Sequence, residues 1–170
     1  MSTVVDRLQR MTLNLTSPDG NLCATVDAER RARFHLRDET RFERYDAPTL
    51  STQVKALLTT MNSGRELGIK RAYAADGREP AAVNGTHWDA AHRRFEAALA
   101  TLELEGYSED GLLLLQSGFD LSGYRVTIDR DDLPRTSPEQ FLRELSGAYR
   151  DLLAHRRQRR AELLREHLGT

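Results

Sequence analysis

Four arginines near the end of the chain are the residues best suited to bind another molecule. Arg156, Arg157, Arg159 and Arg160 lie in the stretch LLAHRRQRRAELLREHL, residues 152–168. Guanidinium groups form charge-assisted hydrogen bonds with phosphates and carboxylates. On a helical wheel, Arg156 and Arg160 fall inside the arc of the apolar residues, and the other two arginines flank it. This arc contains Leu145, Tyr149, Leu152, Leu163 and Leu164.

An apolar face that arginines interrupt for two turns is not expected to lie flat on a core. Either the helix extends past the core with its arginine stems covering apolar surface, or the arginines meet phosphates or carboxylates. A second, weaker basic group consists of Arg30, Arg31 and Arg33, beside Glu29 at an expected turn between strands. These seven arginines are the candidate residues for binding a nucleic acid or a protein partner.

Motifs for other kinds of chemistry are missing from the sequence. It contains no Gly-rich phosphate loop, no Cys-x-x-Cys and no Gly-x-Ser-x-Gly elbow. Cys23 is the only cysteine, which excludes an internal disulfide and a cysteine-based zinc site. His87 and His92 are separated by roughly 140° around a helix and cannot face one metal ion. The sequence therefore predicts a protein that is not an enzyme, with no catalytic residue, cofactor or metal.

The composition is that of a folded protein whose charges nearly balance. Of its 170 residues, 39% are hydrophobic and 30% are charged, and the net charge is −1. Residues 1–85 carry 13 basic and 11 acidic groups, whereas residues 86–170 carry 12 and 15. Such a balance gives no overall field that would require nucleic acid. No run approaches the ~18 apolar residues of a membrane span, and no signal segment opens the chain, so we expect a cytoplasmic protein without a membrane partner.

A phrase that occurs twice indicates how these residues are positioned. TSPDGNLCATVD begins at Thr16 and YSEDGLLLLQSG at Tyr107, which places Gly20 and Gly111 91 residues apart. The same offset relates two strands and a helical stripe. In that stripe Leu50, Val54, Leu57, Leu58 and Met61 match Phe141, Leu145, Ala148, Tyr149 and Leu152. A turn, two strands and a helix face at one offset indicate an internal duplication.

Each copy reads as an α-β-β-β-α unit, in an α+β fold with antiparallel sheets and long C-terminal helices. Alternating apolar residues around Asp-Gly predict a hairpin, because glycine supplies the positive φ of a tight turn. A third strand follows at 33–36 and at 124–128, where the register between the copies shifts by one residue. The second long helix begins at Ser137, and the first begins at Asp46 or Thr49. We expect units at 1–74 and 86–170, joined by a linker at 75–85.

This unit resembles the YbaB/EbfC family. The stretch SPDGNLCATVDAERRARFHLRDETRFERYDAPTLSTQVKALL, residues 17–58, and the stretch SEDGLLLLQSGFDLSGYRVTIDRDDLPRTSPEQFLREL, residues 108–145, carry the likeness. Family members are small bacterial proteins that dimerise, and the best-known branch binds DNA in the nucleoid. Actinobacterial relatives are encoded with type VII (ESX) secretion systems, and the first copy is most similar to that branch. Two units in one chain imply a fused pseudo-dimer.

The resemblance and the arginines lead to two functional hypotheses. In the first, the chain is a nucleoid-associated protein that binds DNA non-specifically through phosphate contacts. In the second, it is a protein-binding adaptor or chaperone of a type VII secretion system. The arginine cluster and the best-known branch favour DNA, whereas the near-neutral charge and the acidic second half favour a protein partner. Either hypothesis leaves a homo-oligomer open.

Overall fold

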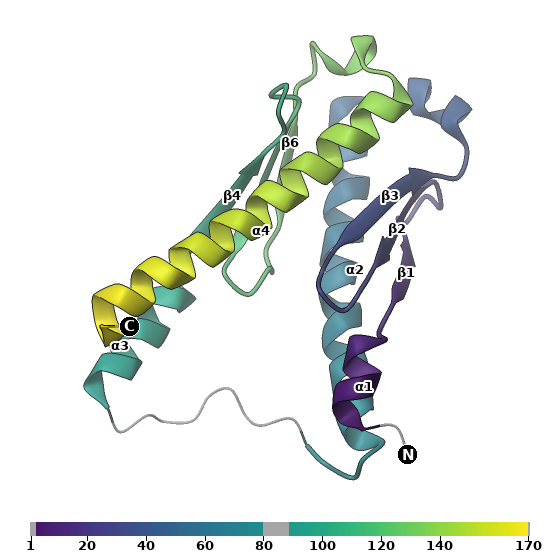
Figure 1. The fold of residues 1–170 in the computed structure, drawn as a ribbon. Helices are drawn as coiled ribbons and strands as arrows, with labels where there is room; N and C mark the ends of the chain where they lie inside the picture. The colour runs from purple at the N-terminus through teal and green to yellow at the C-terminus, as the bar shows by residue number, and fades with distance from the viewer. Residues whose placement is uncertain (1–2, 80–88, 170) are drawn as a thin grey trace.

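The protein is an α+β protein with two three-stranded antiparallel sheets over the residues that the structure describes, as the sequence predicts (Figure 1). The structure is a computed structural model, and it describes residues 3–79 and 89–169. Most of the expected linker, residues 80–85, lies outside these ranges, as does His87. The first half contains α1 (Val4–Gln9), β1 (Leu13–Thr16), β2 (Leu22–Val26), β3 (Ala32–Leu36), η1 (Glu39–Arg44) and α2 (Ala47–Ala74). The second half contains α3 (Ala90–Ala100), β4 (Glu103–Tyr107), β5 (Leu113–Gly118), β6 (Arg125–Ile128), η2 (Leu133–Arg135) and α4 (Pro138–Leu168).

The first hairpin of each half closes in the same way. Gly20 has φ +77° and Gly111 has φ +75°, the left-handed conformation that glycine adopts without strain. The amide of Leu22 donates to Ser17 Oγ at 3.0 Å, and the amide of Leu113 donates to Ser108 Oγ at 2.8 Å. The Ser-x-Asp-Gly phrase therefore forms the same turn twice, and both predicted hairpins are confirmed.

The third strand confirms the predicted shift of one residue. Leu22 pairs with Leu36, whereas Leu113 pairs with Ile128, one position farther along at the repeat offset. The second hairpin turns both contain a non-glycine residue at positive φ, Arg30 at 65° and Leu121 at 61°. In the second half Gly123 follows at φ +63°, and it is the additional residue in that turn.

Both long helices begin at a side-chain cap. Thr49 N donates to the carboxylate of Asp46 at 2.7 Å, so Asp46 rather than Thr49 caps α2. Gln140 N donates to Ser137 Oγ at 3.1 Å, as expected for α4. In each case the cap satisfies a backbone N–H that has no partner within the helix.

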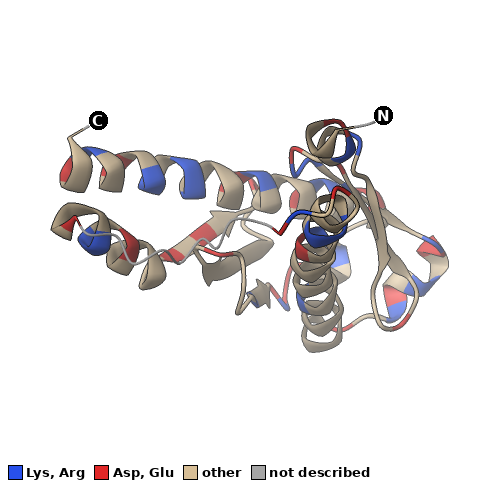
Figure 2. Cartoon of the chain, turned by 90° about the horizontal axis from the view of Figure 1, so that it is seen from below, with Lys and Arg blue, Asp and Glu red and all other residues tan. Residues whose placement is uncertain are grey.

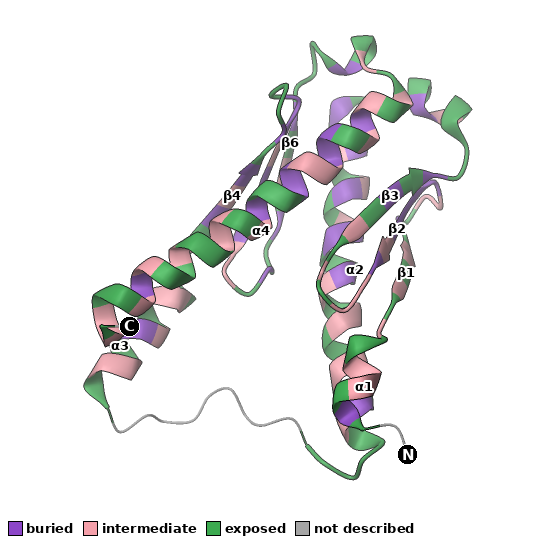
Figure 3. Cartoon of the chain, viewed as in Figure 1, coloured by how far each residue is buried: buried purple, intermediate pink, exposed green. Residues whose placement is uncertain are grey.

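The two halves share one hydrophobic core. Helix α2 packs on β1 and β2 of its own sheet and on β6 of the other, and α4 packs on β4, β5 and β3. The rings of Phe42 and Phe141 lie 5.2 Å apart, and those of Phe34 and Tyr149 lie 6.0 Å apart. All ten residues of the matched helical stripes are buried (Figure 3). Each long helix therefore has one face covered by both sheets.

The far end of α4 does not extend bare into solvent. Its last turns pack against α3, and Leu163 and Phe95 are both buried there. The apolar residues that follow the arginines on α4 therefore form a second packing contact, with α3, that is separate from the main core. No helix among residues 3–79 and 89–169 is both long and apolar enough to cross a membrane.

Candidate functional site

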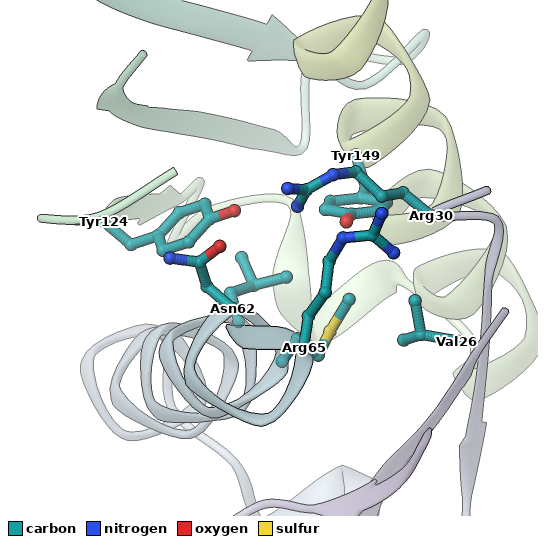
Figure 4. A pocket seen from close by; sticks show the side chains of 8 residues that line it. Val26, Arg30, Asn62, Arg65, Tyr124 and Tyr149 are labelled. Atoms are coloured by element: carbon teal, nitrogen blue, oxygen red, sulfur yellow. The ribbon is translucent and has the colours of Figure 1, made fainter. Parts of the chain in front are cut away.

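A small pocket lies where the two halves meet. It is lined by Val26 and Arg30 of the first half's strand region, by Asn62 and Arg65 of α2, and by Tyr124 and Tyr149 of the second half. The cavity measures about 10 Å³, which is room for about one water molecule. Figure 4 shows the side chains of Arg30, Arg65, Tyr124 and Tyr149 converging on this space.

One arginine of each long helix holds a turn of its own half. Arg65 Nη1 donates to the carbonyl of Ala28 at 2.7 Å, and Arg156 Nε donates to the carbonyl of Phe119 at 2.8 Å. Both pairs are related by the offset of 91. Arg156 also lies over the ring of Phe119, with its guanidinium carbon 4.4 Å from the ring centre. These contacts fix the two guanidinium groups at the junction.

Three guanidinium groups repel one another at this junction. Burial lowers the pKa of Arg65, and the charge of Arg30 lowers it further. Burial also lowers the pKa of Arg156, with added contributions from Arg30 and Arg160. Among the described residues, Arg30, Arg65 and Arg156 form no ion pair. The nearby Asp27 acts on Arg65 at longer range, but its carboxylate is bonded to Arg31 Nε at 2.7 Å.

The pocket also offers hydrogen-bond donors that have no acceptor. Arg65 Nε is buried and finds no partner among the described residues. Tyr124 is only 2% exposed, and its hydroxyl forms no hydrogen bond with any residue in the described ranges. Burial raises the pKa of Tyr124 and also that of Tyr149, so both hydroxyls remain protonated at neutral pH. The hydroxyl of Tyr149 accepts a hydrogen bond from Arg30, which opposes part of this effect on Tyr149. The pocket therefore offers more donors than acceptors, and its acceptors are neutral groups, the amide oxygen of Asn62 and the two hydroxyls.

The structure brings together only some of the seven arginines singled out in the sequence. Arg30 and Arg160 both lie close enough to Arg156 for their charges to act on it. Arg159 pairs with Glu162, and Arg31 pairs with Asp27 and Glu29. Arg33 and Arg157 are exposed, on β3 and α4, and form no ion pair within the described part of the chain.

Sequence reasoning missed Arg65, Asn62, Tyr124 and Tyr149 as site residues. The signal for Arg65 was present, because the offset of 91 that relates the halves places Arg65 opposite Arg156. Arg65 also follows Leu58 and Met61 on the apolar face of α2, so it interrupts that face as Arg156 interrupts α4. Tyr149 lies in the core, as the helical stripe predicts, and its place in the pocket lining depends on the docking of the two halves.

The described residues contain no group of three or more His, Cys, Asp or Glu side chains that could hold a metal ion. Cys23 is free and buried in β2. Comparison with protein-family models, with curated proteins and with solved structures gave no match to this chain.

Proposed function

We propose that this chain is a non-enzymatic, cytoplasmic DNA-binding protein of the YbaB/EbfC-like, nucleoid-associated type, built as a fused pseudo-dimer of two α-β-β-β-α units. Three features support the duplication: the matched Ser-x-Asp-Gly turns, the matched contacts from helix arginine to turn carbonyl, and the equal burial of the helical stripes. The resemblance to the family in residues 17–58 and 108–145 supports the type of function.

The observation that carries the proposal is a cluster of arginines contributed by both halves. Arg30 and Arg65 come from the first half, and Arg156 and Arg160 from the second, without a carboxylate paired to any of them in the described ranges. Holding like charges together in a partly buried place costs free energy, and a polyanion offsets that cost.

The direction of the cluster favours a linear polyanion. Arg156, Arg157 and Arg160 continue the positive charge from the junction along α4, where basic positions recur toward its C-terminal end (Figure 2). A duplex presents phosphates repeatedly along its length, so several arginines in a row can each neutralise one. Contacts of this kind need no base recognition.

The test is a titration of fluorescently labelled duplex DNA at several salt concentrations, followed by anisotropy. We expect affinity to fall as salt rises, with a log–log slope of about −0.9 for each phosphate contact. Arg157 and Arg160 are exposed and unpaired, so replacing both by Gln should leave folding intact. The double variant should reduce the slope by up to roughly 1.8.

A matched control removes two positive charges from another helix. Lys70 and Arg71 are exposed near the end of α2, and Lys70→Gln with Arg71→Gln should leave the slope unchanged. Weak binding at every salt concentration, with both double variants behaving as the wild type, would overturn DNA binding. The cluster would then be assigned to an acidic protein partner, as in the adaptor hypothesis.

A further inference from the structure

The junction pocket has the chemistry of an anion site rather than of a structural ion pair. Its polar lining supplies the guanidinium groups of Arg30 and Arg65, the amide of Asn62 and two tyrosine hydroxyls. Among the described residues no carboxylate lines it. An interior group that carries charge without a partner is costly. The guanidinium of Arg65 is partly such a group: its Nη1 donates to the carbonyl of Ala28, but its buried Nε has no partner among the described residues.

The size of the pocket limits what can enter it. A cavity of about 10 Å³ takes one water-sized group, such as a single oxygen of a larger anion. Arg30 is only partly buried and lies on the turn between β2 and β3, so the pocket borders solvent on that side. A tetrahedral anion can therefore place one oxygen among the donors and keep the others at the surface beside Arg30.

We propose that this pocket binds one phosphate-type oxyanion, held by Arg30, Arg65 and the hydroxyl of Tyr124. Arg30 and Arg65 belong to the first half and Tyr124 to the second, so the bound anion ties the halves together. The guanidinium fork suits the oxygens of a phosphate, and the tyrosine hydroxyl adds a neutral donor. This inference goes beyond the proposed function, because it requires a phosphate group but no nucleic acid.

Binding to the folded state alone stabilises it by mass action. We expect inorganic phosphate to raise the Tm by about 3–6 °C when its concentration is roughly ten times Kd, relative to chloride at equal ionic strength. Phosphate also stabilises proteins non-specifically at high concentration. The measurement therefore uses millimolar phosphate, with calorimetric titration to obtain Kd.

Two variants assign the effect to the pocket. Tyr124→Phe keeps the buried ring and removes one donor, and it should weaken phosphate binding by about tenfold or more. Arg30→Gln should weaken it at least as much. Lys70→Gln is the control, because Lys70 is exposed on α2 outside the pocket and its loss changes the net charge equally. Its Kd should match that of the wild type.

Equal Tm values in phosphate and chloride would overturn the proposal, as would a phosphate effect that Tyr124→Phe and Arg30→Gln leave unchanged. A second experiment, with DNA, distinguishes a backbone phosphate from a free phosphate as the group that the pocket binds. If the pocket takes a backbone phosphate, Tyr124→Phe weakens DNA binding and inorganic phosphate competes with DNA. If it takes a free phosphate, both leave DNA binding unchanged. Because the phosphate titration contains no DNA, its failure is independent of a failure of the proposed function.

Discussion

The carboxylate of Asp19 organises the first hairpin turn. Ser17 Oγ donates to it at 2.6 Å and the amide of Asn21 at 3.0 Å, and the hydroxyl of Tyr45 also donates to it. Asp19 N in turn donates to Gln53 Oε1 of α2 at 3.0 Å. The second half repeats this last link, because Asp110 N donates to Glu144 Oε2 at the same distance. The long helix therefore fixes the hairpin turn in each half.

Protonation of Asp19 should weaken the fold. Burial alone would raise the pKa of Asp19, but hydrogen bonds from Ser17, Tyr45 and Asn21 and the charge of Arg41 outweigh it and lower the pKa below 3.8. A lowered pKa in the folded state contributes stability that is present above pH ~3.8 and is lost as pH falls below it. Wild type should therefore be more stable than Asp19→Asn at pH 7, and the difference should shrink toward pH 3. Urea unfolding across this range measures it, and a constant difference would contradict it.

Arg30 should lower the stability of the folded state when no anion is bound. Its charge acts against both Arg65 and Arg156, and removing it relieves that repulsion. In phosphate-free buffer of low ionic strength, Arg30→Gln should raise the Tm, and added chloride should reduce the gain by screening. Arg33→Gln should show no comparable gain. A lower Tm for Arg30→Gln would contradict this, and would mean that the hydrogen bond of Arg30 with Tyr149 stabilises the fold by more than the repulsion costs.

Which arginines meet could not be predicted from sequence, because the meeting depends on how the halves dock. Helical spacing placed Arg156 on the apolar face correctly. It did not predict the contact with Phe119, nor the proximity of Arg30, which is 126 positions away in the chain. Local patterns report which face a residue occupies. They do not report which distant segment covers that face.

At the scale of elements, the first strand of each half packs against the long helix of that half at a glycine. This glycine is on the helix in the first half and on the strand in the second. In the first half Leu13 and Leu15 of β1 lie over Gly64 of α2, with a side-chain carbon of Leu13 3.5 Å from a Cβ placed there. In the second half the small residue is on the strand. A Cβ at Gly106 of β4 would lie 2.3 Å from the carbonyl oxygen of Ala148 on α4. The strand β4 therefore approaches the helix backbone more closely than a side chain permits.

Gly106→Ala should therefore destabilise the protein strongly. The added methyl group meets backbone atoms of α4, which can move only if strand and helix separate, so we expect a loss of about 1–3 kcal/mol or more. Gly147→Ala is the matched control, because it lies inside α4 with open space around its Cβ position. It should instead gain up to about 1 kcal/mol from helix propensity. Chemical denaturation gives both values, and a harmless Gly106→Ala would show that the strand is free to shift.

The hairpins, the caps and the register shift followed from sequence because each depends on a few neighbouring residues. Asp-Gly requires a tight turn wherever it stands between alternating apolar residues, and Ser137 with Pro138 marks a helix start without help from tertiary contacts. Gly106 lacked such a local signal. In the sequence, Gly106 only interrupts an alternation of apolar residues. Its importance comes from the backbone of α4, which lies too close to leave room for a side chain.

At the scale of the molecule, the arrangement of the halves is reciprocal. Each long helix covers its own sheet and reaches the third strand of the other, β6 for α2 and β3 for α4. One cluster of buried side chains consequently includes residues from both sheets and both helices. The sequence divides the chain at 75–85, but neither half can bury its helix face fully without the other. Stability is thus a property of the joined halves.

A single cooperative unfolding transition should follow from this shared core. Val54 and Leu145 occupy matching positions in the two helical stripes, and both are 0% exposed. Truncation to Ala should cost about 2 kcal/mol or more at each site, because it removes buried methyl groups and leaves a cavity. If the core is one unit, Val54→Ala and Leu145→Ala should each move the whole transition in calorimetry, with the calorimetric and van't Hoff enthalpies equal.

Hydrogen exchange should likewise show the amides of β2 and β5 losing protection together in either variant. Two separate transitions, with Val54→Ala moving only one and Leu145→Ala only the other, would show that each unit folds on its own and that the junction merely joins two finished domains.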